Sequence, residues 1–404
     1  MKFFFPFCLV FTISASAQSE NILEKLLHSS GQFDEILDNP KRYQTQIIYT
    51  QIDRDAENRP TFRTYTHGLD NRYYYPASTI KMPVAFLALE TLNRLGINGL
   101  DKHSAMLTAA GHEPQTAARV DTSSQNGLPS VGHYVRKVFL VSDNDAYNRL
   151  YELVGQDAIH RRLSEMGYEN FRIVTRVGIG GFDREANRYT NPVSFFDERG
   201  RMLYHQGERY GNAPIDLDLT EEVRGAGYWN GEQTVSEPFD FTEKNYVPLR
   251  VFHDVLQAVL FPDAVPAERR FDLTEEDYAF LYRAMSERPR DSDSPRYDKP
   301  DNYVKFFYHG DDETTPIPDH LRIFNKVGWA YGFLTDVSYV VDLEAGTEFL
   351  LAATIHVNEN EVYNDGNYEY ETIGLPFLAK LGALIMAHEK SRERLHRPDF
   401  SHLK

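Results

Sequence analysis

Two residues of the sequence, Ser78 and Lys81, have the types and spacing of an activated nucleophile. A serine hydroxyl attacks an acyl group efficiently only when a base removes its proton. On a helix, a lysine three residues after the serine lies on the same face, one turn away, where its amine can take that proton. The simpler interpretation makes Ser78 a helix cap and Lys81 a solvated side chain. The spacing alone is weak support, because Ser401 and Lys404 repeat it.

Two further motifs carry polar groups that could assist such a serine. Ser142-Asp143-Asn144 lies between two stretches with helical spacing, and by itself it is equally typical of a cap for a helix starting near Asp145. Both roles are compatible, because cap geometry would hold the Ser142 hydroxyl in place. Lys326-Val327-Gly328 ends a predicted strand, where the simpler interpretation is a sheet-edge lysine followed by a turn glycine. Lys380-Leu381-Gly382 repeats that pattern.

The order of the three motifs along the chain resembles the active-site set of the serine β-lactamases and penicillin-binding proteins, most of all the class A β-lactamases. The resemblance implies that Ser78 is acylated, with Lys81 as its base. It implies that Ser142 passes a proton to the leaving nitrogen, while Asn144 binds the substrate amide and Asp143 braces the loop. The joint match therefore predicts one site from motifs that are each weak alone.

The same resemblance gives roles to the third motif. It implies that Lys326 supports Ser142 and the substrate carboxylate, and that Gly328 lets the substrate lie along the strand. The N–H groups of Ser78 and Trp329 would form the oxyanion hole, helped by the positive end of a helix starting at Ser78. Val327 departs from the family pattern, in which a threonine hydroxyl often binds a β-lactam carboxylate. Losing one such bond costs about 1.5–3 kcal/mol, so we expect weakened antibiotic binding.

Release of the acyl group needs a water that the protein activates. Class A β-lactamases use a glutamate followed four residues later by an asparagine, and the nearest match is Asp183 with Asn187. Asp is one methylene shorter, so the water could sit about 1 Å out of place, which costs on the order of a hundredfold in rate. Glu185 is the alternative base, and a solvated loop is the plain interpretation of both acids.

Hydrophobic periodicity predicts the elements that must position these residues. Strands are expected at 43–52, 61–65, 322–327, 336–343 and 348–356, and helices at 82–95, 131–141, 146–154, 247–260, 274–285 and 372–390. We therefore predict an α/β fold of the α+β type, with an antiparallel sheet built from N- and C-terminal strands, packed by helices, plus an all-helical lobe. The catalytic domain would span 18–404, with a sheet lobe at about 40–75 and 320–404 and a helical lobe at about 76–319 that carries an insertion at about 196–245.

The N-terminus predicts export. Residues 1–17 combine Lys2, an apolar stretch and Ala15-Ser16-Ala17 as a small-residue cleavage site, which is typical of a secretory signal peptide. The single cysteine, Cys8, lies inside this peptide, so the mature chain would hold neither thiol nor disulfide. The formal charge of −17 argues against nucleic acid as a partner, and no later stretch is apolar enough to predict a membrane span. The expected location is the periplasm or the medium.

The leading hypothesis is thus an exported serine hydrolase of the class A type, which opens a β-lactam ring through an acyl-enzyme on Ser78 that water then hydrolyses. A peptidoglycan D-Ala-D-Ala carboxypeptidase or other serine acyl hydrolase, and a non-catalytic penicillin-binding sensor, are the alternatives. The expected partner is a small β-lactam or peptidoglycan-like molecule. No cofactor and no metal site are predicted, because the histidines lack ligand spacing. The sequence leaves the oligomeric state open.

Overall fold

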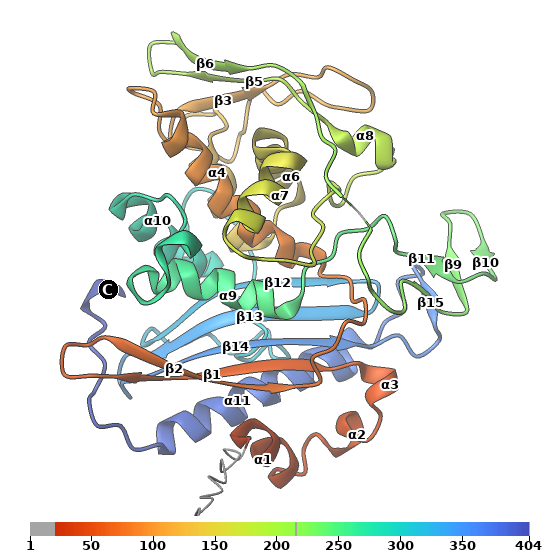
Figure 1. Ribbon diagram of the computed structural model, residues 1–404, viewed down its shortest axis with the longest axis vertical. Coiled ribbons are helices and arrows are strands. Elements are labelled where there is room, and N and C mark those ends of the chain that lie inside the picture. Colours follow the sequence, from red (N-terminus) through yellow and green to blue (C-terminus); the bar gives the residue numbers. More distant parts are fainter. Residues whose placement is uncertain (1–20, 215, 404) are drawn as a thin grey trace, which may run out of the picture.

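A five-stranded sheet forms the centre of the molecule in the computed structural model, which describes residues 21–214 and 216–403 (Figure 1). The predicted signal peptide lies outside the described residues. All neighbouring strands in the sheet are antiparallel. Their order is β12 (Leu321–Ala330), β13 (Phe333–Asp342), β14 (Thr347–His356), β1 (Gln46–Arg54) and β2 (Pro60–His67). The predicted α+β fold, with its sheet drawn from both ends of the chain, is confirmed.

Each face of the sheet has its own apolar core, as the alternation of side chains along a strand requires. On β1, Ile48 packs in the core that also holds residues of α9 (Leu249–Leu260), whereas the next-door Ile47 packs in the opposite core. That second core is closed by α1 (Ile22–Ser29) and α11 (Leu375–Ser391), which lie below the sheet in Figure 1. Both isoleucines are completely buried.

Helix α11 extends from a π-helical turn, Tyr370–Gly374. Together, Tyr370–Ser391 are the one segment of the described chain that is long and apolar enough to cross a membrane by length and composition. Leu378, Leu381 and Ile385 on this helix are completely buried against the sheet. The apolar composition is therefore that of a core helix.

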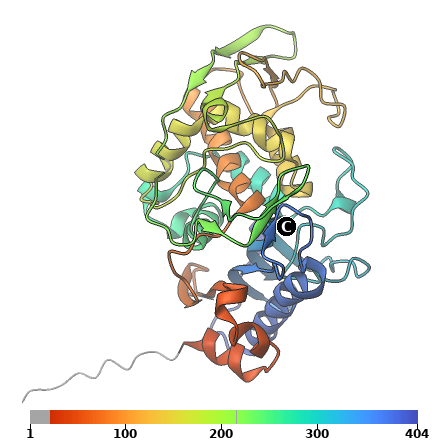
Figure 2. The ribbon, with the colours of Figure 1, turned by 90° about the vertical axis from the view of Figure 1, so that its right-hand side faces the viewer.

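The helical lobe is organised around α4 (Lys81–Leu95), which is buried on almost every side. It contacts α5 (Val131–Val141) and α6 (Asn144–Val154) (Figures 1 and 2). α7 (Gln156–Glu165) contacts α6, and α10 (Glu275–Ser286) contacts both α5 and β12. Pro83 lies in the first turn of α4, where its missing N–H removes no helical hydrogen bond. Gly96 ends the helix with a left-handed backbone (φ 61°).

The structure corrects three boundaries. Ser78 lies in a 3-10 turn, η1 (Ala77–Ile80), so α4 begins at Lys81 and not at the serine. Tyr43 belongs to a short helix, α3 (Pro40–Tyr43), and β1 starts only after the left-handed Gln44. Lys326 lies inside β12 instead of closing it, because the strand pairs with β13 as far as Ala330 and turns at two residues with positive φ, Tyr331 and Gly332.

Two long stretches connect these elements. Residues 196–245 carry only short strands, namely β6 (Met202–Gln206), β7 (Arg209–Tyr210), β8 (Val223–Arg224), β9 (Gly227–Trp229), β10 (Thr234–Val235) and β11 (Phe239–Asp240). Most residues of 287–318 are outside helices and strands, apart from one 3-10 turn at Pro289–Asp291. The second stretch matters for the site, because it packs against β12.

Candidate active site

Lys81 is the residue at which the first two motifs meet. As the first residue of α4 it is completely buried. Its Nζ donates to the Ser142 carbonyl oxygen at 2.5 Å and to Asn144 Oδ1 at 2.6 Å, and it lies 3.4 Å from Ser142 Oγ. Asn144 is nevertheless exposed, so a substrate can reach its amide. The predicted convergence of Ser-x-x-Lys with Ser-Asp-Asn is present.

Ser142 lies between two lysines. It ends α5 in the left-handed conformation (φ 58°), which turns the chain sharply before Asp143 caps α6 by accepting from the Ala146 N–H at 2.8 Å. Lys326 Nζ donates to Ser142 Oγ at 2.8 Å and to the Val327 carbonyl oxygen at 2.8 Å. The cap and the shuttle interpretations of this motif are compatible in this geometry.

The backbone around Ser78 is packed directly on β12. A Cβ added to Gly328 would lie 2.5 Å from the Pro76 carbonyl oxygen and 2.7 Å from the Ser78 nitrogen, so only glycine allows this approach. Ala77, just before the serine, has a positive φ of 46°, a strained conformation that often marks functional sites. Ser78 itself is half-buried, and its hydroxyl has no hydrogen-bond partner within the described chain. Catalytic hydrogen bonds often tighten only when substrate binds.

Burial tunes both site lysines toward the neutral amine. Removal from water lowers the pKa of Lys81 to about 7, opposed only by the field of Asp143. Burial, and then the nearby charge of Lys81, hold the pKa of Lys326 well below its usual range. A large fraction of Lys81 is therefore uncharged near neutral pH, the state in which it can accept a proton.

Trp329 presents an aromatic surface next to this site. Its side chain is 38% exposed and packs on the rings of Tyr303 and Phe306, with centroid distances of 6.1 and 5.2 Å. Both partners come from the 287–318 stretch, which lies outside the three motifs. Their aromatic types were the one available sequence signal. The oxyanion role of the Trp329 N–H stays a prediction.

The residues proposed to activate water are not joined to the lysines. Asp183 is exposed and caps the short helix α8 (Arg184–Arg188) by accepting from the Ala186 N–H at 2.8 Å. Glu185, also exposed, accepts from the Tyr210 hydroxyl at 3.2 Å. Asn187 is buried, and its amide bonds the backbone of this loop at Arg176 N and the Asp183 carbonyl oxygen. Their catalytic and binding roles stay hypotheses.

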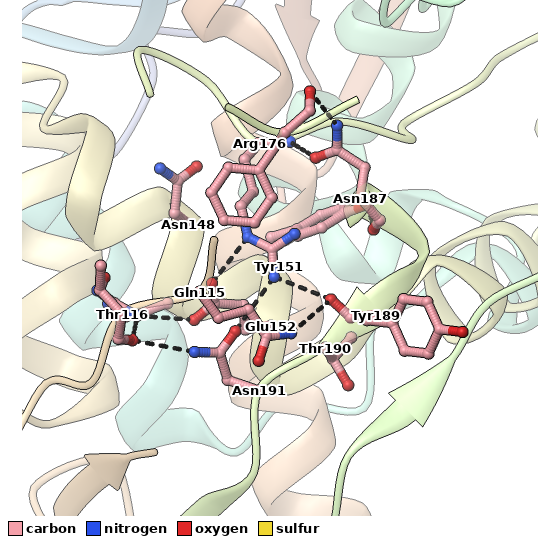
Figure 3. Close-up of polar contacts among 12 residues, drawn as sticks. Gln115, Thr116, Asn148, Tyr151, Glu152, Arg176, Asn187, Tyr189, Thr190 and Asn191 are labelled. Carbon is pink, nitrogen blue, oxygen red and sulfur yellow. Dashed lines mark hydrogen bonds and ion pairs between the residues drawn. The ribbon is translucent and has the colours of Figure 1, made fainter. Parts of the chain in front are cut away.

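A different part of the loop that leads into α8, residues 176–178, packs against α6 beside the site. Three residues on successive turns of α6, Asn144, Asn148 and Glu152, each hold one loop residue. Glu152 accepts from Arg176 Nε at 2.8 Å, both side chains being buried (Figure 3). Asn148 bonds both backbone groups of Val177, at 2.9 and 3.1 Å.

The third contact, at the site itself, involves a glycine. A Cβ on Gly178 would lie 2.0 Å from Asn144 Nδ2, so no side chain fits between the loop and Asn144. Gly178 also has a positive φ of 62°. Gly178 belongs to none of the three motifs; the spacing of four between the three α6 residues was the signal that could have located this contact. Gly178, the loop residue that lies against Asn144, therefore brings no carboxylate to Lys81.

The described residues offer no alternative centre based on metal. No three His, Cys, Asp or Glu side chains within 21–214 and 216–403 are grouped so that they could hold an ion. In the same ranges, no carboxylate lies within ion-pair distance of Lys81, whose three hydrogen-bonding contacts are with Ser142 and Asn144. The chemistry that the arrangement can support is acylation of a serine assisted by two lysines.

Comparison with known proteins agrees with this geometry. Residues 32–197 match the model of the Beta-lactamase enzyme family, a stretch that contains Ser78, Lys81 and Ser142 and ends before Lys326. The match covers less than half of the chain, and over these residues the sequence is similar to that family, within which class A is not distinguished. No curated protein matches the chain.

Several solved structures are similar over most of their length. They include a β-lactamase from Desulfarculus baarsii (14% identity, TM-score 0.47, 92% of this chain and 99% of that chain) and the structure of PBP-A (13%, 0.49, 92% and 97%). A β-lactamase from Chitinophaga pinensis is 13% identical, with a TM-score of 0.47 over 89% of this chain and 99% of that one. These likenesses are too distant to bear on what the protein does.

Proposed function

We propose that the protein is a serine hydrolase of the β-lactamase and penicillin-binding type, which reacts with β-lactams or related peptidoglycan amides by acylation of Ser78. The observation that carries the proposal is the position of Lys81, a buried amine whose hydrogen bonds join the second motif to the helix start that follows Ser78. A buried lysine without a function would be costly, since its charge is removed from water.

The acylation step uses the groups of the three motifs. Neutral Lys81 takes the proton of Ser78, directly or through Ser142, and the serine oxygen bonds to the substrate carbonyl carbon. The N–H groups of Ser78 and Trp329 would hold the carbonyl oxygen while it carries negative charge. The C–N bond then breaks, and Ser142 donates its proton to the leaving nitrogen and recovers one from a neighbouring lysine. The product is an ester on Ser78.

The fate of that ester separates the candidate functions. The class A hypothesis needs a carboxylate that activates water, and both candidates, Asp183 and Glu185, are exposed and bonded elsewhere. Gly178, which adjoins Asn144, offers no side chain. These observations favour slow deacylation, as in a penicillin-binding protein. We therefore propose efficient acylation followed by a long-lived acyl-enzyme, with fast β-lactamase turnover as the second candidate.

One experiment tests the proposal. The mature protein is mixed with a chromogenic cephalosporin, and both colour and intact mass are followed. A stoichiometric burst with a persistent mass adduct supports the long-lived acyl-enzyme, whereas sustained turnover supports the β-lactamase candidate. Ser78→Ala should abolish the adduct and any turnover. If the wild-type protein shows neither adduct nor turnover, or if the variant retains them, the proposed function is wrong. Hydrolysis of a D-Ala-D-Ala peptide then tests carboxypeptidase activity.

The location is part of the proposal. We propose that residues 1–17 direct export and are removed, because their charge, apolar stretch and small-residue end match a signal peptide. Peptidoglycan and β-lactams are both met outside the cytoplasm. Fractionation of expressing cells, with mass determination of the product, should find a chain that begins near Gln18. A full-length product in the cytoplasm would overturn this part.

A further inference from the structure

A series of buried polar side chains joined by hydrogen bonds lies on the opposite face of β12 from the site. Lys305, in the 287–318 stretch, donates to Asn325 Oδ1 at 2.8 Å and to the Met285 carbonyl oxygen at 2.7 Å. Asn325 Nδ2 donates to Asp336 Oδ1 at 2.9 Å. Asn325 precedes Lys326 on β12, so the two side chains lie on opposite faces of the strand. This hydrogen-bonded series thus includes the residue directly before Lys326.

Asp336 is the anionic end of this hydrogen-bonded series and is completely buried. It lies on β13 directly opposite Val327, the residue after Lys326. Its carboxylate accepts from Asn325, from the Ser338 hydroxyl at 2.7 Å and from the N–H groups of Phe306 and Phe307 at 2.9 and 3.3 Å. A carboxylate that is taken out of water and given four donors is held in one place, and it fixes whatever it bonds.

The charges around Lys326 make Asp336 distinctive. Facing Lys326 are Lys81 from α4, Lys305 from the 287–318 stretch and Asp336 from β13, so two amines, when protonated, repel the charge of Lys326 and one carboxylate attracts it. Lys305 faces Asp336 and also the fields of Glu287, Arg288 and Asp291. Without the field of Asp336, the buried Lys326 would be surrounded only by charges of its own sign.

We propose that Asp336 is a positioning residue for acylation: its negative charge opposes the loss of the Lys326 proton and, through Asn325, it holds β12 where Lys326 donates to Ser142. The inference rests on the proposed acylation at Ser78. Lys305 bonds Asn325, and the N–H groups of Phe306 and Phe307 bond Asp336 itself, so the 287–318 stretch with its aromatic residues beside Trp329 is tied to the same network. The site is thereby coupled to a segment that the three motifs do not include.

Two substitutions with opposite expected effects test this. The rate of Ser78 acylation by a chromogenic cephalosporin is followed by stopped flow from about pH 5 to pH 10. Asp336→Asn removes the anion, so Lys326 loses its proton more easily and the alkaline limb of the profile should move down by about one pH unit. Lys305→Gln removes an amine that repels the charge of Lys326 while it is protonated. That limb should therefore move up, by less than about half a unit because burial lowers the pKa of Lys305 to about 7. Loosened packing alone would not give shifts of opposite sign.

Asp342→Asn is the matched control, because Asp342 is also buried, lies on the same strand and pairs with Lys390 at 2.7 Å far from the motif. It should lower the thermal unfolding temperature without moving the limb. An adduct on wild-type protein shows that acylation itself occurs, so an unmoved limb in both test variants overturns only the inference on Asp336. If Asp336→Asn does not fold, Lys305→Gln carries the test: an upward shift supports the inference and an unmoved limb overturns it.

Discussion

Two regions were assigned to the site from the sequence: the lysine junction, where Lys81 and Lys326 contact Ser142, and the α8 loop, which holds Asp183 and Glu185. Their contacts in the structure differ. At the junction, Lys81 reaches Ser142 across 61 positions and Lys326 reaches it across 184, with both lysines buried. In the loop, Asp183 bonds a backbone group only three residues away. A residue whose contacts are fully explained by a structural role, such as a cap on an exposed helix, is therefore a poor candidate for a catalytic role. A lysine among apolar residues has no sufficient plain interpretation.

The largest effect on acylation is expected at Lys81. Lys81→Met should lower the acylation rate by roughly a thousandfold, because a general base contributes on that order. In the wild-type protein, acylation should rise with pH through about 7, since the amine acts as a base only after it loses its proton. Stopped-flow acylation at several pH values measures both effects. The control is Lys244→Met, which replaces a partly buried lysine outside the motifs. Equal losses of acylation rate in both variants would show that Lys81 is not the base.

The next largest effect is expected at Gly328. In Gly328→Ala, the new methyl group would lie against backbone atoms of Pro76 and Ser78, which cannot move away as a flexible side chain could. We expect about 1–3 kcal/mol of lost stability and an acylation rate lower by roughly a hundredfold, because the nucleophile is displaced. Denaturant unfolding and burst kinetics measure these. Gly207→Ala, where nothing lies within 4 Å, should leave both unchanged. A normal burst in Gly328→Ala would contradict the close packing.

A smaller loss is expected at Gly178, where the loop meets the junction. Gly178→Ala must push aside Asn144 Nδ2, the amide whose oxygen accepts from Lys81, and adopt a positive φ that costs about 1 kcal/mol. Acylation should fall by roughly tenfold, while the mass adduct still forms. Gly180→Ala, in the same loop with open space around it, is the control. If the two variants behave alike, Gly178 does not contact the site as described.

The smallest effects are expected from the loop acids. Asp183→Asn keeps the cap of α8, because asparagine caps helices as well as aspartate, and Glu185→Gln changes an exposed side chain. Deacylation, followed as the loss of the mass adduct over time, should change by less than about twofold in either variant. A loss of two orders of magnitude in one of them would restore that residue as the base that activates water.

Much of the fold could be predicted because its signals are local. The helix at 131–141 was predicted to the residue, since apolar spacing and the polar residues at its ends agree. The boundaries of β12 and η1 were missed for a tertiary reason. β12 continues past Gly328 because β13 pairs with it as far as Ala330, and the residue types within β12 do not predict where that pairing ends.

The site was predictable to the extent that its residues form motifs. Ser78, Lys81, Ser142 and Lys326 were identified by type and order, and their convergence follows. Gly178 and Asp336 were not, because their importance lies in what they contact: an amide on another helix and a network on the far face of a strand. Spacing along the chain carries no trace of such contacts, whereas burial and hydrogen bonds reveal them.

The position of β1 has a consequence for the newly made chain. β1 pairs with β14 on one side and β2 on the other, so the N-terminal hairpin cannot complete its sheet until the last strands have been synthesised. Such distant pairing slows folding. Lys326 is also synthesised late, after both of the other motifs. We therefore expect a ribosome-bound chain to show no reactivity toward acyl compounds until synthesis is almost finished.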